Sequence, residues 1–160
     1  KDYWFGWASA VGPDWVYQED SFEIVAQIHD SHGSSSPPWT LSTSVPRHRQ
    51  TPEYRGKWIM TGPGDNILTP VIPGQWEAFV LHYIPAFDNT GLVQFWHNGE
   101  LVVDRKNIKT STNYSGRGPY WKQGVYHYWN ESNGKNRDIF HDQMRFFAGE
   151  DGYNKVDPTK

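Results

Sequence analysis

The chain contains no cysteine, which excludes disulfide bonds and cysteine-ligated zinc. It has no apolar run long enough to cross a bilayer, and its first residues carry no signal-peptide pattern. A basic excess is also missing, because 15 Lys and Arg stand against 18 Asp and Glu, for a net charge of −3. A general nucleic-acid binder would show a basic stripe or a high isoelectric point. We therefore expect no nucleic acid and no membrane among the partners.

Convincing helical periodicity is absent, and short alternating segments are instead separated by Gly, Pro, Asn and Asp clusters. This pattern is typical of an all-β sandwich, and 160 residues most simply form one domain. Asn98-Gly99, between two such segments, predicts a type I′ hairpin turn. Residues 149–160 are expected to be a polar tail. The expected strands are 22–29, 39–43, 76–84, 93–97, 100–103, 120–129 and 138–148.

Aromatic residues are abundant, at 16% of the chain with nine Trp and nine Tyr. Most of them are expected to fill the interior of the sandwich. A surplus of Trp and Tyr also suits a surface that stacks on flat ligand faces such as sugar rings.

Two short segments place polar, proton-handling side chains at alternate positions. Residues two apart in a strand share a face, so Gln27 and His29 point the same way, and so do Tyr120, Lys122 and Tyr126. An amide, an imidazole, an ammonium and a phenol on one sheet surface suit an acidic substrate. Strict alternation over 22–29 predicts Phe22, Ile24, Ala26 and Ile28 toward the core, and Glu23, Val25, Gln27 and His29 on the opposite face.

Gln-Ile-His at 27–29 and Tyr-x-Lys-x-Gly-x-Tyr at 120–126, with the Asn-Gly hairpin between them, resemble paired motifs of the β-jelly-roll polysaccharide lyases. That superfamily includes alginate lyases, glucuronan lyases and the heparin-lyase-I type. The resemblance covers about residues 3 to 147. It implies an all-β jelly roll, a concanavalin-like sandwich of two antiparallel sheets with a concave substrate groove. Further matching segments are Pro37-Pro38-Trp39, Phe95-Trp96-His97-Asn98-Gly99 and Ile139-Phe140-His141-Asp142.

The resemblance implies an extracellular, secreted enzyme that cleaves a uronic-acid polymer such as alginate or glucuronan by β-elimination. The proton at C5 is weakly acidic, so the neighbouring carboxylate must be neutralised by preorganised donors. The resemblance assigns this role to Gln27, and to His29 either this role or that of the base. It assigns Tyr126 as the acid, and often as the base too. Lys122 would supply the positive charge that favours an ionised phenol.

Such lyases usually carry an arginine-containing strand upstream of Gln-x-His, and this chain begins after that place. We therefore expect residues 1–160 to form a single domain that lacks its N-terminal strands. Its exposed sheet edge could be completed by a second polypeptide or fragment. Arg47 and Arg49 are expected to be either plain surface charges or contacts to the polyanion. Tyr120 and Tyr128 are expected to contact sugar or simply to pack.

No cofactor is required by this chemistry. His-x-x-His at 29–32 places its two imidazoles on opposite strand faces, which disfavours zinc. Asp138 and Asp142 could belong to a structural calcium site, although a solvated strand end explains them as well. Two rival functions stay open, because fold does not fix function: a non-catalytic, lectin-like carbohydrate-binding domain, and a structural part of a larger assembly.

Overall fold

The computed structural model describes residues 1–19, 21–30, 36–46, 50–63, 66–111, 118–128 and 137–160, and of Tyr128 only the backbone. Two five-stranded sheets make up the fold, and every strand pair is antiparallel. The first sheet runs in the order β10 (Ile139–Ala148), β1 (Tyr3–Val11), β6 (Glu77–Ile84), β7 (Gly91–His97), β8 (Glu100–Ile108). The second runs in the order β5 (Asn66–Pro70), β4 (Lys57–Thr61), β3 (Trp39–Ser44), β2 (Phe22–His29), β9 (Tyr120–Tyr128).

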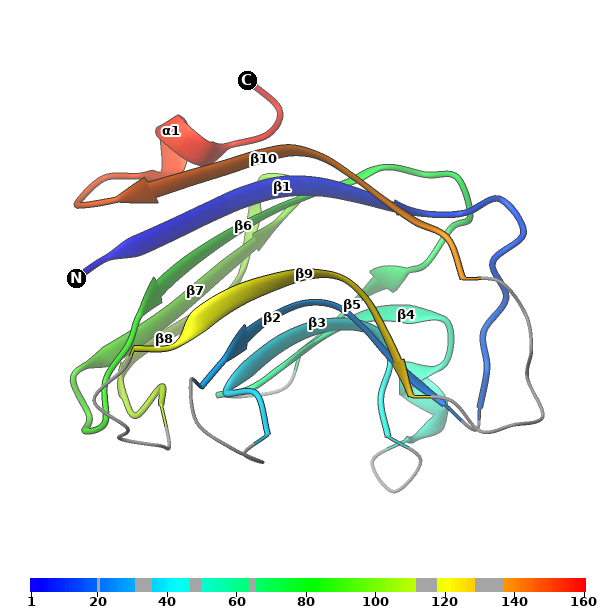
Figure 1. The fold of residues 1–160 in the computed structure, drawn as a ribbon, viewed down its shortest axis with the longest axis horizontal. Helices are drawn as coiled ribbons and strands as arrows, with labels where there is room; N and C mark the ends of the chain where they lie inside the picture. The colour runs from blue at the N-terminus through cyan, green and yellow to red at the C-terminus, as the bar shows by residue number, and fades with distance from the viewer. Residues whose placement is uncertain (20, 31–35, 47–49, 64–65, 112–117, 129–136) are drawn as a thin grey trace.

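Both sheets curve in the same sense, and the second nests under the first (Figure 1). The concave face of the second sheet is turned away from the first sheet, so it is free to face solvent. A 3-10 turn at Pro52–Tyr54 (η2) and a short helix at Tyr153–Val156 (α1) complete the fold. Among the described residues, no helix has both the length and the apolar character needed to cross a membrane.

Aromatic rings fill the interior between the two sheets, as the composition predicts. Trp7, Trp39 and Phe79 are each 0% exposed. The ring of Trp7 packs edge-on against Trp39 at 6.3 Å and stacks on Phe79 at 5.4 Å between centroids. Burying such large apolar surfaces is the main favourable contribution to folding. This core supports the convex side of the second sheet and leaves its concave side open.

The predicted hairpin is confirmed. Asn98 and Gly99 both have positive φ, 50° and 83°, as a type I′ turn requires. The Asn98 side chain also accepts a 2.8 Å hydrogen bond from the backbone N–H of Ala78. The turn is therefore fixed both by its backbone conformation and by a contact to the neighbouring strand β6.

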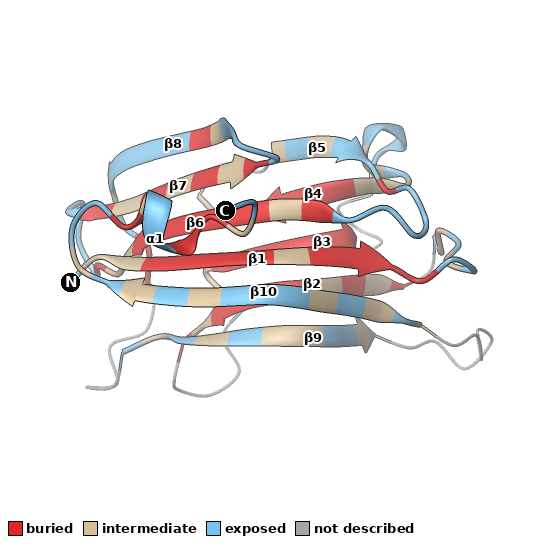
Figure 2. Ribbon diagram, turned by 90° about the horizontal axis from the view of Figure 1, so that it is seen from above, coloured by how far each residue is buried: buried red, intermediate tan, exposed pale blue. Residues whose placement is uncertain are grey.

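The prediction of a polar tail for 149–160 is wrong in its second half. Val156 in α1 is 0% exposed and packs with Trp4 and Val80 on the outer face of the first sheet. The close approach depends on Gly6 in β1, where a Cβ atom would lie 1.7 Å from the carbonyl oxygen of Val156. The C-terminal segment thus covers β1, which is buried on both faces (Figure 2).

Exposed sheet edges are observed at β9 and β10, which lie along the same side of the sandwich (Figure 2). Within the described ranges each of these strands pairs with one neighbour only, β2 and β1 respectively. Met144 and Phe146 of β10 are 44% and 58% exposed. What would cover this side, including a second polypeptide, stays a prediction.

Candidate active site

The predicted site lies on the concave face of the second sheet, where β2 and β9 pair. Lys122 lies opposite Gln27, and Tyr120 lies opposite His29. The rings of His29 and Tyr120 are 5.6 Å apart between centroids, and the Lys122 ammonium is 5.1 Å from the Tyr120 ring. Gln27 is 7% exposed, so its amide is held in place, whereas Tyr120 is 43% exposed. These four side chains therefore form one contiguous polar surface.

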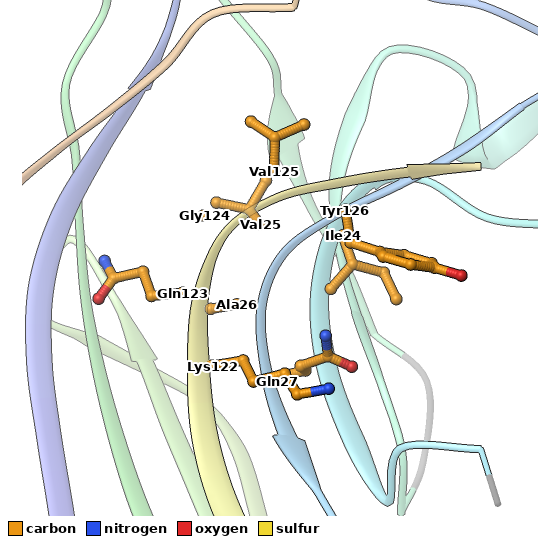
Figure 3. Close-up of a pocket in the computed structure, with 9 residues that line it drawn as sticks. All are labelled: Ile24, Val25, Ala26, Gln27, Lys122, Gln123, Gly124, Val125 and Tyr126. Atoms are coloured by element: carbon orange, nitrogen blue, oxygen red, sulfur yellow. The ribbon is translucent and has the colours of Figure 1, made fainter. Parts of the chain in front are cut away.

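Tyr126 extends this surface beyond an irregularity in the sheet. It lies opposite Ile24 and is 51% exposed. Figure 3 shows Ile24, Gln27, Lys122 and Tyr126 on one side of β9 and Gln123 on the other, around a shallow hollow that all five help to line. Along the strand Tyr126 is about 10 Å from the position of Gln27 and about 16 Å from that of His29, at roughly 3.3 Å per residue. The concave curvature of the sheet turns their side chains toward one another.

The expected alternation along β2 is wrong in its first half. Val25 and Ala26 are consecutive, yet each is 1% exposed and both belong to the core. The pairing register of β2 shifts between Ile24 and Ala26 against both neighbouring strands. Because of this irregularity, the residues before Ala26 point to the face opposite to the expected one. Glu23 and Val25 point inward, and Ile24 lies on the same face as the site residues. Strict alternation cannot anticipate a bulge.

Strand β9 bulges at the same place. Gln123 pairs with Ala26 and Tyr126 pairs with Ile24, so Gly124 and Val125 together stand opposite the single Val25. Gly124 has φ +146°, a conformation that residues with a side chain rarely adopt. The glycine of the Tyr-x-Lys-x-Gly-x-Tyr motif therefore has a backbone role beside Tyr126.

The tautomer of His29 follows from a polar contact to the backbone. Its Nδ1 lies 2.7 Å from the carbonyl oxygen of Asp30. A carbonyl can only accept, so Nδ1 carries the proton and donates it. In the neutral imidazole, Nε2 then holds a free lone pair, as a general base requires.

A family model described as polysaccharide lyase matches residues 1–145. The chain belongs to the polysaccharide lyase family. No curated protein sequence matches this lyase-family chain.

Solved structures show the same fold. The endo-β-1,4-glucuronan lyase of the fungus Trichoderma reesei matches with a TM-score of 0.65 at 19% identity, over 99% of this chain and 71% of its own. The alginate lyase AlyC3 matches with a TM-score of 0.65 at 10% identity, over 91% of this chain and 64% of its own. An alginate lyase of Pseudomonas aeruginosa matches with a TM-score of 0.56 at 13% identity, over 92% and 65%. The lyase-family chain thus spans about two thirds of their length.

Several predicted residues of the lyase site fall outside the described ranges. Arg47 and Arg49 do so, and Tyr128 is described only as the last backbone position of β9; His32 of the disfavoured zinc pattern also lies outside these ranges. Within the described residues, no group of three or more His, Asp or Glu could hold a metal ion. The calcium suggested by Asp138 and Asp142 gains no support from these residues.

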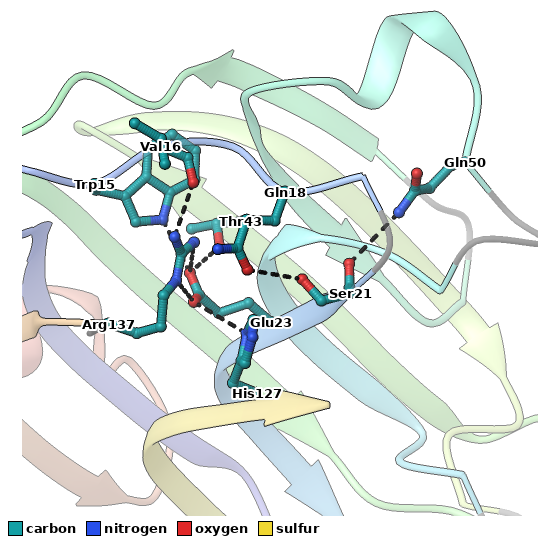
Figure 4. A network of polar contacts seen from close by, with 9 residues as sticks. All are labelled: Trp15, Val16, Gln18, Ser21, Glu23, Thr43, Gln50, His127 and Arg137. Atoms are coloured by element: carbon teal, nitrogen blue, oxygen red, sulfur yellow. Dashed lines mark hydrogen bonds and ion pairs between the residues drawn. The ribbon is translucent and has the colours of Figure 1, made fainter. Parts of the chain in front are cut away.

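Sequence reasoning missed a polar cluster directly behind the site. We call it the Glu23 cluster. Glu23 is 0% exposed, because the bulge turns its carboxylate inward. Burial opposes its charge most strongly, but the hydrogen bonds of Arg137, Thr43 and Trp15, together with the charge of Arg137, hold the pKa of Glu23 below its ordinary value. The cluster consists of Glu23, Arg137, Thr43, Trp15 and His127 (Figure 4).

Proposed function

We propose that this protein cleaves a uronic-acid-containing polysaccharide by β-elimination, and that it acts outside the cell. The observation that carries the proposal is the gathering of Gln27, His29, Lys122 and Tyr126 on one open, concave sheet face of a lyase-family fold. The matching structures are named glucuronan lyase and alginate lyase, which supports a uronate polymer as substrate. An open concave face also admits internal segments of a long chain.

Neutralising the uronate carboxylate is the first requirement of this reaction. The buried Gln27 amide and the Lys122 ammonium opposite it are the donors best placed for this task. An amide whose position is fixed by burial needs little reorganisation when negative charge develops on the substrate. We therefore propose that Lys122 contacts the carboxylate, in addition to its predicted influence on Tyr126.

Proton transfer is the second requirement. Tyr126 presents an exposed phenol that can donate to the glycosidic oxygen leaving from C4. Where the C5 proton and that oxygen lie on the same face of the ring, Tyr126 can serve as base and acid in turn. Where they lie on opposite faces, His29 with its free Nε2 is the proposed base.

Incubation with defined polymers tests this proposal. Glucuronan and polymannuronate present the proton and leaving oxygen on one ring face, and polyguluronate presents them on opposite faces. Cleavage should create unsaturated ends that absorb ultraviolet light. His29→Ala should reduce cleavage of polyguluronate more than cleavage of the other two. If no uronate polymer yields absorbance although it binds, the protein is a carbohydrate-binding domain and the enzyme proposal is wrong.

A further inference from the structure

We propose that the Glu23 cluster, acting through His127, positions Tyr126 for proton transfer. This inference rests on the proposed function and extends it to residues that never touch substrate. Glu23 and His127 would be positioning residues: they stand opposite one another (Figure 4), each adjacent in sequence to a residue that lines the hollow of Figure 3, Ile24 and Tyr126.

Tyr126 has few anchors of its own. In the described part of the chain its hydroxyl has no hydrogen-bond partner, and its ring contacts Phe22 at 5.7 Å between centroids. The strand that carries it is an edge strand with a bulge two residues earlier, where Gly124 takes φ +146°. Backbone of this kind bends easily. Among the described residues, the contacts that hold β9 from the inner side are therefore the ones available to fix the orientation of Tyr126.

Two inward contacts flank the bulge. Before it, Gln123 Nε2 lies 3.0 Å from His141 Nδ1 of β10. After it, His127 Nδ1 lies 3.5 Å from Glu23 Oε2. His127 immediately follows Tyr126 in the chain and stands opposite Glu23, so the second contact is the nearer one to the phenol. Nδ1 of His127 is buried and makes no hydrogen bond within the described ranges, so its close approach to the Glu23 carboxylate is the polar contact that joins this end of β9 to the Glu23 cluster.

Four hydrogen bonds hold the carboxylate of Glu23. Arg137 donates to both of its oxygens, at 2.6 Å from Nε and 3.2 Å from Nη2. Thr43 and Trp15 add hydrogen bonds of 2.5 Å and 3.1 Å. The anion is thereby tied to β3, to the segment before β2 and to Arg137, two residues before the start of β10. A group fixed from so many directions can hold the end of an edge strand.

His127→Leu tests the proposal, because leucine keeps the packing and removes the polar contact. His127→Asn is the rescue, since its amide nitrogen can take the place of Nδ1. The matched control is His97→Leu, which removes the imidazole of another buried His–Glu pair, 2.9 Å between Nε2 and Glu77 Oε2, in the other sheet. Should His127→Leu not fold, Thr43→Val removes one hydrogen bond to Glu23 without touching β9.

Two readouts are measured on each variant: amide hydrogen exchange of β9, and kcat and KM on the uronate polymer that the wild type cleaves. We expect His127→Leu to speed exchange in β9 severalfold and to lower kcat at least about tenfold, with KM within about twofold. The asparagine variant should restore both readouts, and the control should change neither. Unchanged exchange in β9, or an unchanged kcat, would overturn the inference. If the wild type cleaves nothing, the proposed function fails, and the exchange data still decide whether His127 holds the strand.

Discussion

Among the described residues, two buried glutamates each face a histidine, one in each sheet. Glu77 of β6 is 2% exposed and accepts hydrogen bonds from His97 at 2.9 Å, from Gln75 at 2.7 Å and from Asn98. We call this the Glu77 cluster. Burial is the main cause that lowers the pKa of His97, although Glu77 opposes the shift. This shift favours the neutral imidazole, and among the described residues no Lys or Arg donates a hydrogen bond to Glu77.

The Glu23 cluster differs from the Glu77 cluster in the sequence separation of its members and in the charge of its donors. The Glu77 cluster joins the start of β6 to the adjoining end of β7 and its turn, so it stabilises one end of a hairpin. Glu23 instead binds a guanidinium 114 residues away in sequence, whereas His97 and Asn98 lie 20 and 21 residues from Glu77. The same pair of residue types therefore joins the ends of neighbouring strands in one sheet and, with Arg137, joins distant segments behind the proposed site in the other.

Removing the charge from each glutamate should give the largest difference between the two clusters in the loss of unfolding free energy. Glu23→Gln leaves the Arg137 guanidinium, whose side chain is 8% exposed, without its anion. Breaking such a buried pair costs about 3–5 kcal/mol. Glu77→Gln weakens hydrogen bonds to the carboxylate but leaves no guanidinium without its anion, so it should cost about 1–3 kcal/mol. Urea unfolding of both variants measures the difference, and equal losses would show that the two clusters are energetically alike.

Substituting alanine at two glycines with positive φ should destabilise the protein less, and it compares the β9 bulge with a turn elsewhere in the chain. Gly124 in the β9 bulge has φ +146° and Gly74 in a turn has φ +79°, and nothing lies within 4 Å of an added Cβ at either position. Each substitution should therefore cost about 1 kcal/mol of stability from backbone strain alone. Only Gly124→Ala should also slow polymer cleavage. A similar loss of cleavage in Gly74→Ala would mean that general destabilisation explains both.

The pH dependence of stability distinguishes the buried histidines from Glu23 in two separate pH ranges. Burial lowers the pKa of His97 and of His141 below the ordinary 6.5, so unfolding takes up protons and stability falls as the pH drops through that value. The pKa of Glu23 lies below the ordinary 4.5, so its contribution is complete above that pH and is lost as the pH falls toward the folded-state pKa.

Variants should show which residue causes the loss of stability in each of the two pH ranges. His97→Leu should reduce the slope between about pH 7 and 5 by up to one proton, or about 1.4 kcal/mol per pH unit. Glu23→Gln should flatten the dependence below about pH 5 instead. Thermal unfolding across the pH range provides the measurement. If His97→Leu changes the slope of stability against pH below about pH 5 and leaves the slope between about pH 7 and 5 unchanged, the assignment is wrong.

Much of the fold could be predicted because several strands have one buried face and one open face. The hairpin at Asn98-Gly99 and the strands around Gln27 and Tyr120 follow the expected alternation or turn chemistry. Strand β1 could not be recognised, because the C-terminal segment covers its outer face and both of its faces are buried. Alternation then carries no signal.

The site was predicted in part for the same reason. Gln27, His29, Lys122 and Tyr126 do share a face, as strand parity and the family resemblance indicated. Their chemical roles remain predictions. The place of Glu23 could not be read from the sequence, because it depends on a bulge that reverses the parity of β2. Contacts between residues far apart in the chain, such as Glu23 and Arg137, give no local signal either.

The most direct test of the central claim is the rate at which Tyr126→Phe forms unsaturated ends from the uronate polymer that the wild type cleaves. Phenylalanine keeps the ring against Phe22 and removes only the proton donor. We expect the rate to fall by about 10²–10⁴-fold while polymer binding, measured by calorimetry, stays within about twofold. A variant that forms unsaturated ends at the wild-type rate would contradict the assignment of the concave face of β2 and β9 as the active site.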